Sequence, residues 1–572
     1  MKKSAVFAMT ILLGLFAISA LSATPSTFEI KKSKQPPVSP AWVFDHWVWE
    51  DDDNTQDAVF ELVNGYAEHN IPVGAVVIDS PWSTEYNNFV WNREAYPDPE
   101  GMINKLHERG IKVILWATTM MNETSNSGNF EPKTGNIYYE AKKKGYLCNN
   151  GKAHKWWKGE GGFLDFTNQD ARDWLHKMMD NVIDMGIDGW KTDGIASLFP
   201  SDGTCMTGPL SMQKYKDMYY MDMYEYIHSR NPQAISWSRS VDIRAANPKG
   251  FAPISHSPVN WVGDELHDWS SNGFIEAIED VLDSGRLGYT VVGSDIAGYN
   301  GSMEISKQLL IRWAQFGALN PLMENGGHKA HEPWLHDQET TDIYRKFTRL
   351  HLELKPYLYS MMIKGHEKKS SIIHPTGGKY QYRLGDHLFA SILYTEENSR
   401  EVSFPSGKWM DYWEPGKFYS EDDTISYNCP LDRYPLFVRV GSIIPLSVVD
   451  GELGHGDDTF AGKITLDIVP GDSSRFLLCE EGRDRVPIAL TMDGGKNFSV
   501  SAGTGTRPFI IRAYSDEHPY DVIVNGENIP PSENLSGLGG TPGYYFYDEA
   551  SKRIFINPGS CDKLDVKVTF ED

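Results

Sequence analysis

Residues 186–194 read Gly-Ile-Asp-Gly-Trp-Lys-Thr-Asp-Gly, a short run that ends in the acidic Asp193 immediately before a loop. Similar short apolar runs lie at Ala41–Trp49, Val73–Asp79, Ile111–Thr118, Ala234–Arg239, Pro258–Asp264, Tyr289–Asp295 and Phe316–Asn320. Segments with helical spacing separate most of them, for example Thr55–His69, Gln169–Met185, Met212–Ser229 and Gly273–Asp283. Alternating strands and helices indicate an α/β protein, and eight such units predict a closed (β/α)8 TIM barrel over residues 41–370.

The sequence changes character after a long helical stretch at Thr340–Lys364. Residues 371–572 show short alternating strands, such as Lys379–Arg383, Leu436–Val440 and Lys563–Phe570, separated by Gly, Pro, Asn and Asp. This pattern is typical of β-sandwich modules. A weak break near residue 450 divides the region into a proximal module, 371–450, and a distal module, 451–572.

Charged residues stand at the ends of several predicted barrel strands. They are Asp79, Asp193, Arg239, Asp264 and Asp295. The C-terminal ends of the strands form the face of a β/α barrel at which active sites are built. One aspartate in this place could cap a helix or form a turn, but five charged strand ends favour a functional cluster.

Asp193 is the first candidate for chemistry. Lys191 precedes it by two residues, and a nearby cation helps a carboxylate to stay ionised, as a glycosidic nucleophile must. The structural alternative is a Lys–Asp pair that holds a loop at the barrel rim.

Asp264 is the second candidate, in the segment Asn260-Trp-Val-Gly-Asp264. A general acid needs a raised pKa, and the apolar Trp261 can supply the desolvation that raises it. Glu265 and Asp268 are rival acids in the same segment. Two carboxylates at neighbouring strand ends permit glycoside hydrolysis with retention if they lie about 5–5.5 Å apart, and with inversion at about 6.5–9.5 Å. The sequence leaves this distance open.

The ordered motifs resemble glycoside hydrolase family 31 over residues 40–450. The segments concerned are VIDSPW (77–82), GWKTDG (189–194), SWSRS (236–240), NWVGD (260–264), GSDIAGY (293–299), NPLMENGGH (320–328) and HEPW (331–334). Within the family, DSPW (79–82), KWWKGEGG (155–162) and LDFTN (164–168) look nearest to the branch with α-galactosidase-like members.

The resemblance implies a retaining α-glycosidase with Asp193 as nucleophile and Asp264 as acid/base. It implies that Asp79 and Arg239 hydrogen-bond the hydroxyls of the cleaved sugar and that His328 is the histidine of the same subsite. Trp190, Trp261 and Asp295 match pocket-wall positions, and Lys191 joins them as a substrate-binding candidate. Members of the family need no metal and no organic cofactor.

Two departures bear on the substrate. The large β-sandwich that usually precedes the barrel in this family is replaced by a short segment, and the nucleophile segment reads KTDGIA (191–196) where α-glucosidases carry W-x-D-M-N-E. We therefore expect hydrolysis of terminal α-glycosidic bonds in oligo- or polysaccharides, with a slight preference for α-galactosides. The alternatives are an α-glucosidase, a transglycosylase on the same scaffold, and a non-catalytic carbohydrate-binding protein.

Charge and targeting signals define the remaining expectations. The net charge of −24, with no dense Lys/Arg cluster, argues against a nucleic-acid partner. Lys2 and Lys3 precede an apolar run that ends at Ile18 and is followed by small residues, which is the pattern of a signal peptide over residues 1–23. A Pro-rich linker over 24–40 follows, so we expect a periplasmic or secreted protein without a membrane anchor. The oligomeric state stays open.

Five widely spaced cysteines, at 148, 205, 429, 479 and 561, give neither a disulfide framework nor a metal motif, although one bridge in the C-terminal part is possible. His331 and His336 are expected to be packing residues, and no metal-binding spacing accompanies them. Trp156 and Trp157 either line a distal subsite or are buried.

Overall fold

Eight parallel strands form the predicted barrel, in the order β12-β11-β10-β7-β3-β2-β1-β13. The computed structural model describes residues 34–125, 137–244, 250–505, 507–559 and 563–571, so the predicted signal peptide lies outside the described residues. The barrel strands are β1 (His46–Val48), β2 (Ala75–Ile78), β3 (Lys112–Ala117), β7 (Gly189–Thr192), β10 (Ile235–Arg239), β11 (Val259–Trp261), β12 (Val292–Gly293) and β13 (Met323–Asn325). A parallel bridge joins Asp295, just after β12, to Glu324 in β13. It connects the two ends of the strand order and closes the barrel.

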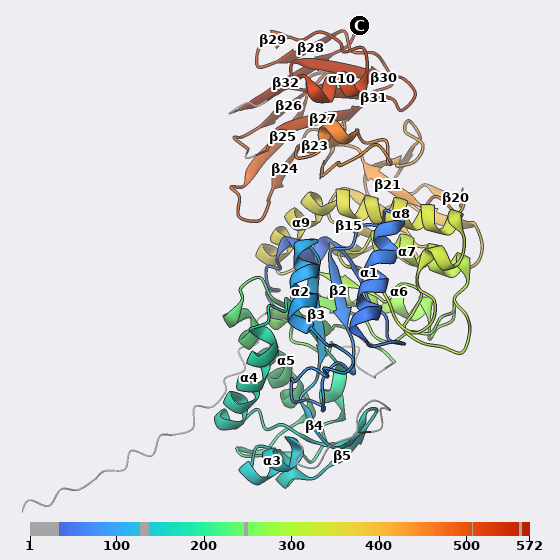
Figure 1. The fold of residues 1–572 in the computed structure, drawn as a ribbon. Coiled ribbons are helices and arrows are strands. Elements are labelled where there is room, and N and C mark those ends of the chain that lie inside the picture. Colours follow the sequence, from blue (N-terminus) through green and yellow to red (C-terminus); the bar gives the residue numbers. More distant parts are fainter. Residues whose placement is uncertain (1–33, 126–136, 245–249, 506, 560–562, 572) are drawn as a thin grey trace, which may run out of the picture.

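Helices surround the barrel, as the alternating pattern predicts (Figure 1). They are α1 (Gln56–Glu68), α2 (Pro99–Glu108), α4 (Gln169–Ile183), α5 (Met212–Arg230), α6 (Phe274–Leu287), α7 (Lys307–Ala318), α8 (Gln338–Glu353) and α9 (Lys355–Lys368). Several begin at a side-chain cap, since Thr55, Asp98 and Ser211 each accept a hydrogen bond from a backbone N–H of the first turn. Among the described residues, no helix combines the length and apolar character needed to cross a bilayer.

One element assignment from the sequence is wrong. The predicted strand at 316–320 overlaps the end of α7, and the eighth strand is β13, a few residues later. All residues of α7 from Leu309 to Ala318 are buried, so burial is not confined to one face of the helix. The sequence therefore lacks the periodicity that distinguishes a helix from a buried strand. The helical stretch predicted at 340–364 lies within α8 and α9, which are separate helices because Pro356 lacks the N–H needed to continue α8.

An insertion after β3 covers one end of the barrel and lies at the opposite end of the molecule from the C-terminal module (Figure 1). It contains β4 (Met120–Ser125), α3 (Ile137–Lys144), β5 (His154–Trp156) and β6 (Gly159–Phe163), with the three strands paired in the order β4-β6-β5. A second small hairpin, β8 (Thr204–Cys205) with β9 (Gly208–Pro209), follows β7.

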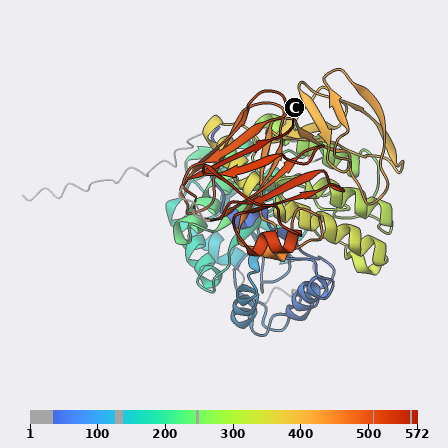
Figure 2. The same ribbon diagram turned by 90° about the horizontal axis from the view of Figure 1, so that it is seen from above.

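The region after the barrel consists of two β modules, as predicted. The proximal one contains β14 (Ile373–Pro375), β15 (Gln381–Leu384), β16 (Leu388–Ser391), β17 (Ser399–Ser403), β18 (Lys408–Asp411), β19 (Phe418–Ser420), β20 (Thr424–Asn428) and β21 (Leu436–Arg439). Its six-stranded sheet has the order β14-β15-β16-β21-β18-β19, and β17 pairs with β20. Figure 2 shows this module, in yellow to orange, beside the distal one, in red.

The distal module is a sandwich of two sheets, in the orders β22-β23-β27-β31-β30 and β24-β25-β26-β32-β28-β29. Its strands are β22 (Ser442–Leu446), β23 (Ile464–Val469), β24 (Ser474–Leu478), β25 (Val486–Met492), β26 (Phe498–Ala502), β27 (Phe509–Tyr514), β28 (Asp521–Val524), β29 (Glu527–Asn528), β30 (Tyr544–Asp548), β31 (Arg553–Asn557) and β32 (Leu564–Thr569). The short helix α10 (Leu535–Gly540) accompanies them. Because β22 pairs with β23, this sheet begins before residue 450.

Arg312 on α7 joins the barrel to the proximal module. Its guanidinium is fully buried and donates hydrogen bonds to the carbonyl oxygens of Arg433 and Cys429, both at 2.8 Å, and to the side chain of Asn398 at 2.9 Å. Charged donors to buried acceptors are among the stronger hydrogen bonds in proteins.

We expect Arg312→Ala to lower the free energy of unfolding by about 3–5 kcal/mol, because it leaves buried carbonyl groups unpaired. Chemical denaturation would show this as a lower transition midpoint. Arg286→Ala is the matched control, since Arg286 is 56% exposed and pairs on the surface with Asp283. Equal midpoints for the two variants would contradict the role given to Arg312.

Candidate active site

The C-terminal ends of the barrel strands and the loops beyond them enclose a cavity of about 430 Å³. Its lining residues are Asp79, Trp116, Trp157, Lys158, Lys191, Asp193, Gly194, Ser197, Arg239, Phe251, Asp264 and Tyr299. Five of the sequence-predicted site residues are therefore brought together here: Asp79, Lys191, Asp193, Arg239 and Asp264. A larger cavity of about 790 Å³ lies between α9 and the distal module, and none of the predicted site residues lines it.

Asp193 follows β7 and is held from three sides. Its Oδ1 accepts hydrogen bonds from the Gly194 N–H at 2.6 Å and from Arg239, and its Oδ2 accepts one from Trp116 Nε1 at 3.2 Å. Burial alone raises the pKa of this carboxyl, but the positive charges of Arg239 and Lys191 outweigh burial and lower it. Asp193 is thus an ionised, oriented carboxylate.

Arg239, at the end of β10, contacts both candidate carboxylates with one nitrogen. Its Nη2 lies 3.0 Å from Asp193 Oδ1 and 2.8 Å from each oxygen of Asp264. Asp193 Oδ1 and the oxygens of Asp264 therefore lie at most about 5.8 Å apart, which is the sum of the distances from the shared nitrogen. Its other terminal nitrogen, Nη1, donates to Asp242 Oδ2 at 2.7 Å, which fixes the guanidinium from behind.

Asp264 differs from Asp193 in its electrostatics. Its side chain is 40% exposed, whereas that of Asp193 is 12% exposed. Desolvation raises the pKa of Asp264, the positive charge of Arg239 opposes this, and the negative charge of Asp193 adds to the increase, so that the net shift is upward. The pair therefore combines one carboxyl with a lowered pKa and one with a raised pKa.

Lys191 is buried under the cavity and orients Asp79. Its Nζ donates to Asp79 Oδ2 at 2.7 Å and lies 3.6 Å from the ring centroid of Trp49. Burial alone would lower the pKa of Lys191, but the negative charges of Asp79 and Asp295 raise it above its usual value. Lys191 is thus a permanent cation that supports both Asp79 and Asp193.

Four predicted site residues do not line the cavity. Trp190, Trp261 and Asp295 are buried in the barrel, with at most 1% of each exposed. Trp261 supports the site from below, because Arg239 lies 5.0 Å and Lys191 5.6 Å from its ring centroid. His328 lies outside the cavity, where its Nδ1 is 2.7 Å from Asp52 Oδ1.

The rival acids are also outside the cavity. Glu265 is buried, at 2% exposure, and Asp268 Oδ1 accepts the Ser270 N–H at 2.8 Å. Sequence reasoning missed Trp116, Asp242 and Tyr299. Trp116 is the next-to-last residue of β3 and Tyr299 is the last residue of the GSDIAGY motif, so a strand end and a motif were available signals. Asp242 lies in the loop after β10, and only the path of this loop brings its carboxylate to Arg239. Neither a motif nor a strand end marks it in the sequence.

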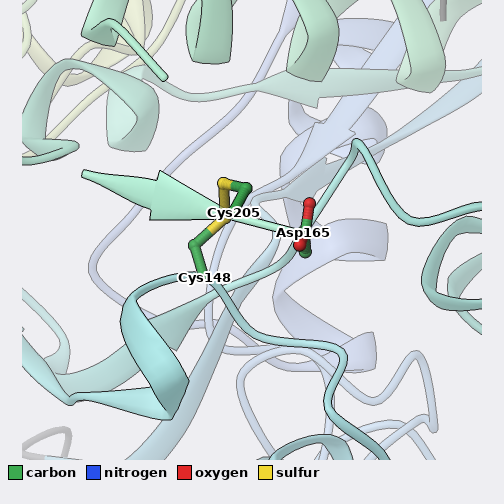
Figure 3. Close-up of side chains that lie close together, drawn as sticks. All are labelled: Cys148, Asp165 and Cys205. Atoms are coloured by element: carbon green, nitrogen blue, oxygen red, sulfur yellow. A yellow bond between two sulfur atoms is a disulfide. The ribbon is translucent and has the colours of Figure 1, made fainter. Parts of the chain in front are cut away.

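A disulfide bond joins Cys148, which precedes β5, to Cys205 in β8, a pairing that the spacing of the cysteines did not predict (Figure 3). Cys429 and Cys479, in the C-terminal part, are buried free thiols, and Cys561 lies outside the described residues. Asp165 lies beside the disulfide and accepts the Met206 N–H at 2.6 Å (Figure 3). Because the two sulfurs are bonded to each other, this group offers no thiolate to a metal.

A closed β/α barrel with paired carboxylates at its C-terminal face is the apparatus of many glycosidases. Comparison with known families agrees with this class. The profile for the glycosyl hydrolases family 31 TIM-barrel domain matches residues 36–361, and that for the family's C-terminal domain matches residues 356–444. The chain therefore belongs to glycosyl hydrolase family 31.

Individual relatives are distant. An isomaltosyltransferase from Sporosarcina globispora is 24% identical over 92% of this chain and 52% of its own length. The alpha-xylosidase XylQ of Lactiplantibacillus pentosus is 27% identical over 80% of this chain and 61% of its own length. A cycloalternan-forming enzyme from Listeria monocytogenes, solved with a pentasaccharide substrate, has the same fold, with a TM-score of 0.84 at 22% identity over 94% of this chain and 55% of that one. The chain thus spans little more than half the length of these relatives.

Proposed function

We propose that the protein hydrolyses terminal α-glycosidic bonds with retention of configuration. The observation that carries the proposal is the contact of Arg239 Nη2 with both carboxylates, which keeps oxygens of Asp193 and Asp264 within about 5.8 Å of each other. This separation suits direct attack by one carboxylate. It is closer to the roughly 5–5.5 Å of retaining enzymes than to the roughly 6.5–9.5 Å that inverting enzymes keep for a water molecule.

In this proposal Asp193 attacks the anomeric carbon while Asp264 protonates the departing glycosidic oxygen. The resulting glycosyl ester on Asp193 is hydrolysed by a water molecule from which Asp264 then takes a proton. Asp79, held by Lys191, and Arg239 accept and donate hydrogen bonds to the hydroxyls of the cleaved sugar. Their buried, fixed positions give this subsite its geometry before substrate arrives.

We propose a gluco-configured sugar as the group transferred. The relatives are named for isomaltosyl and xylosyl groups, and both glucose and xylose carry equatorial hydroxyls at C2, C3 and C4. The preference for α-galactosides expected from the KTDGIA segment has no counterpart among them. Transfer to a second sugar is the main alternative outcome, because water and a sugar hydroxyl compete for the same intermediate.

A non-catalytic binding role fits the site less well. Binding alone does not require two carboxyls whose pKa values are shifted in opposite directions within one contact network.

We further propose that the protein is exported. The basic and apolar N-terminus supports this, and the disulfide bond between Cys148 and Cys205 is of a kind that persists in oxidising compartments.

Hydrolysis of aryl α-glucosides, α-xylosides and α-galactosides tests the catalytic roles. We expect turnover of a glucoside or xyloside by the wild type, a loss of about 10⁴-fold or more in Asp193→Ala, and recovery of Asp264→Ala by azide. NMR of the first product should show the α-anomer.

Asp268→Asn is the matched control, since Asp268 lies in the same segment as Asp264 but outside the cavity. It should retain wild-type activity. Activity that survives Asp193→Ala, or a β-anomer as first product, would contradict the mechanism, and exclusive turnover of the galactoside would contradict the proposed sugar.

The pH profile of kcat/KM provides a second test. Activity requires ionised Asp193, whose pKa is lowered, and protonated Asp264, whose pKa is raised, so activity rises with pH through the first pKa and falls through the second. Lys191→Met removes a cation that lowers the pKa of Asp193, so we expect the acidic limb to move to higher pH.

Lys112→Met is the control for this change, because Lys112 pairs with Asp188 at 2.9 Å near the start of β3, away from the cavity. Its profile should match that of the wild type. An acidic limb that stays in place in Lys191→Met would show that Lys191 does not tune Asp193.

Export is tested by expressing the full chain and sequencing the N-terminus of the mature protein. We expect the protein outside the cytoplasm, cleaved close to residue 23, with a linked Cys148–Cys205 peptide in a non-reducing digest. Retention in the cytoplasm with an intact N-terminus would contradict this proposal.

A further inference from the structure

The loop after β10 contacts both sides of the catalytic pair. Its first part, residues 240–244, follows Arg239 directly along the chain. Asp242 binds Arg239, and Arg244 Nη1 donates a hydrogen bond of 2.6 Å to the backbone carbonyl oxygen of Asp264. One short segment therefore contacts the arginine that joins the two carboxylates and also the residue that serves as acid/base in the proposed mechanism.

Asp242 also packs against the backbone next to Asp264. Its Oδ2 lies 2.8 Å from the position that a Cβ atom would take at Gly263, whose φ of 135° favours glycine. The carboxylate thus occupies the space that a larger residue at this position would need. Because Asp242 contacts Arg239 on one side and the residue before Asp264 on the other, its placement affects both.

Two side chains of α6 hold this segment from behind. Asp280 Oδ2 accepts a hydrogen bond of 2.9 Å from the Ile243 N–H. Ser284 Oγ accepts one of 3.2 Å from the Val241 N–H and donates to Ser240 Oγ at 2.8 Å. Asp280 and Ser284 are four residues apart, so they lie on one face of the helix, and both are fully buried.

The contacts to α6 and to the active site alternate along the segment. Val241 and Ile243 bond to α6 through their backbone N–H groups. Asp242 and Arg244 bond to the active site through their side chains. Since the anchored N–H groups flank Asp242 on both sides, its backbone cannot shift without breaking a buried hydrogen bond, which is unfavourable.

Asp280 is suited to a position close to another acid. Burial raises the pKa of Asp280 to about 8, against the effect of the hydrogen bond from Ile243, and the negative charges of Asp242 and Glu276 add to the increase. At neutral pH Asp280 is therefore mainly an uncharged carboxyl group, which accepts from Ile243 without placing a second negative charge near Asp242. The uncharged amide of an asparagine can make the same hydrogen bond.

We infer that Asp280 and Ser284 are positioning residues for the catalytic pair. They fix residues 240–244, and this segment in turn fixes Arg239 and the acid/base Asp264. No residue of α6, a helix that the structure describes throughout, lines the cavity. The inference rests on the proposed glycosidase function and extends its machinery to a helix on the outside of the barrel.

Two substrates with the same cleaved sugar but different leaving groups test the inference. Fluoride departs from a glycosyl fluoride with little assistance, whereas the alcohol of an alkyl glycoside depends on the proton from Asp264. We expect Asp280→Ala to lower the ratio of kcat/KM for the alkyl glycoside to kcat/KM for the fluoride by about tenfold, because a displaced acid slows the step that needs it. A smaller folded fraction alone would reduce both values equally and leave the ratio unchanged.

Three further variants complete the test. Ser284→Ala removes the second anchor and should lower the ratio by less, which gives a result even if Asp280→Ala folds poorly. Asp280→Asn keeps the hydrogen bond to Ile243 and should retain most of the wild-type ratio. Asp283→Ala is the matched control and should leave the ratio unchanged, because Asp283 lies on the same helix but pairs with Arg286 at the surface.

The inference would be overturned by a wild-type ratio in both Asp280→Ala and Ser284→Ala, or by an equal loss in Asp280→Asn or Asp283→Ala. Absence of fluoride turnover by the wild type would instead contradict the proposed function itself.

Discussion

The guanidinium of Arg239 is the contact on which the geometry of the site depends. It is buried, and it binds Asp193 and Asp264 on one side and Asp242 on the other. A buried guanidinium is stable only when its charge and its donors are satisfied, so the three carboxylates and Arg239 hold one another in place. The fixed fork of donors sets the distance between the two candidate catalytic groups. Their separation is thus determined before a substrate binds.

The same contact accounts for the contrast between the two carboxyls. Asp193 is the more deeply buried and has a second cation, Lys191, close by, so its charge is well compensated. Desolvation raises the pKa of Asp264, and the negative charge of Asp193, with which Asp264 shares Arg239, raises this pKa further. One arginine placed between unequal neighbours can therefore produce a nucleophile and an acid from chemically identical side chains.

Much of this arrangement was predictable, because a barrel strand places its last residue at a known face. Asp79, Asp193, Arg239 and Asp264 were identified in this way, and all four line the cavity. Strand position alone does not say whether a side chain reaches the cavity or remains below it. Asp295 illustrates this limit, since it forms the bridge that closes the barrel and its pKa is raised by burial and by the neighbouring Glu324.

The failures of sequence reasoning have local physical causes. His328 does not line the cavity itself, but its ring lies 5.0 Å from that of Tyr299, which does, and Gly327 before it adopts a φ of 146° that favours glycine. The disulfide bond joins cysteines 57 residues apart whose proximity depends on how two loops pack, which no local pattern reports.

The insertion shows why such loops matter for this chain. The β-sandwich that usually precedes the barrel in the family, and that often adds a loop to the pocket, has no counterpart in the described residues before β1. The β5–β6 turn of the small three-stranded sheet contributes Trp157 and Lys158 to the cavity wall. The disulfide bond between Cys148 and Cys205 ties the segment that leads into this turn to the loop after the nucleophile.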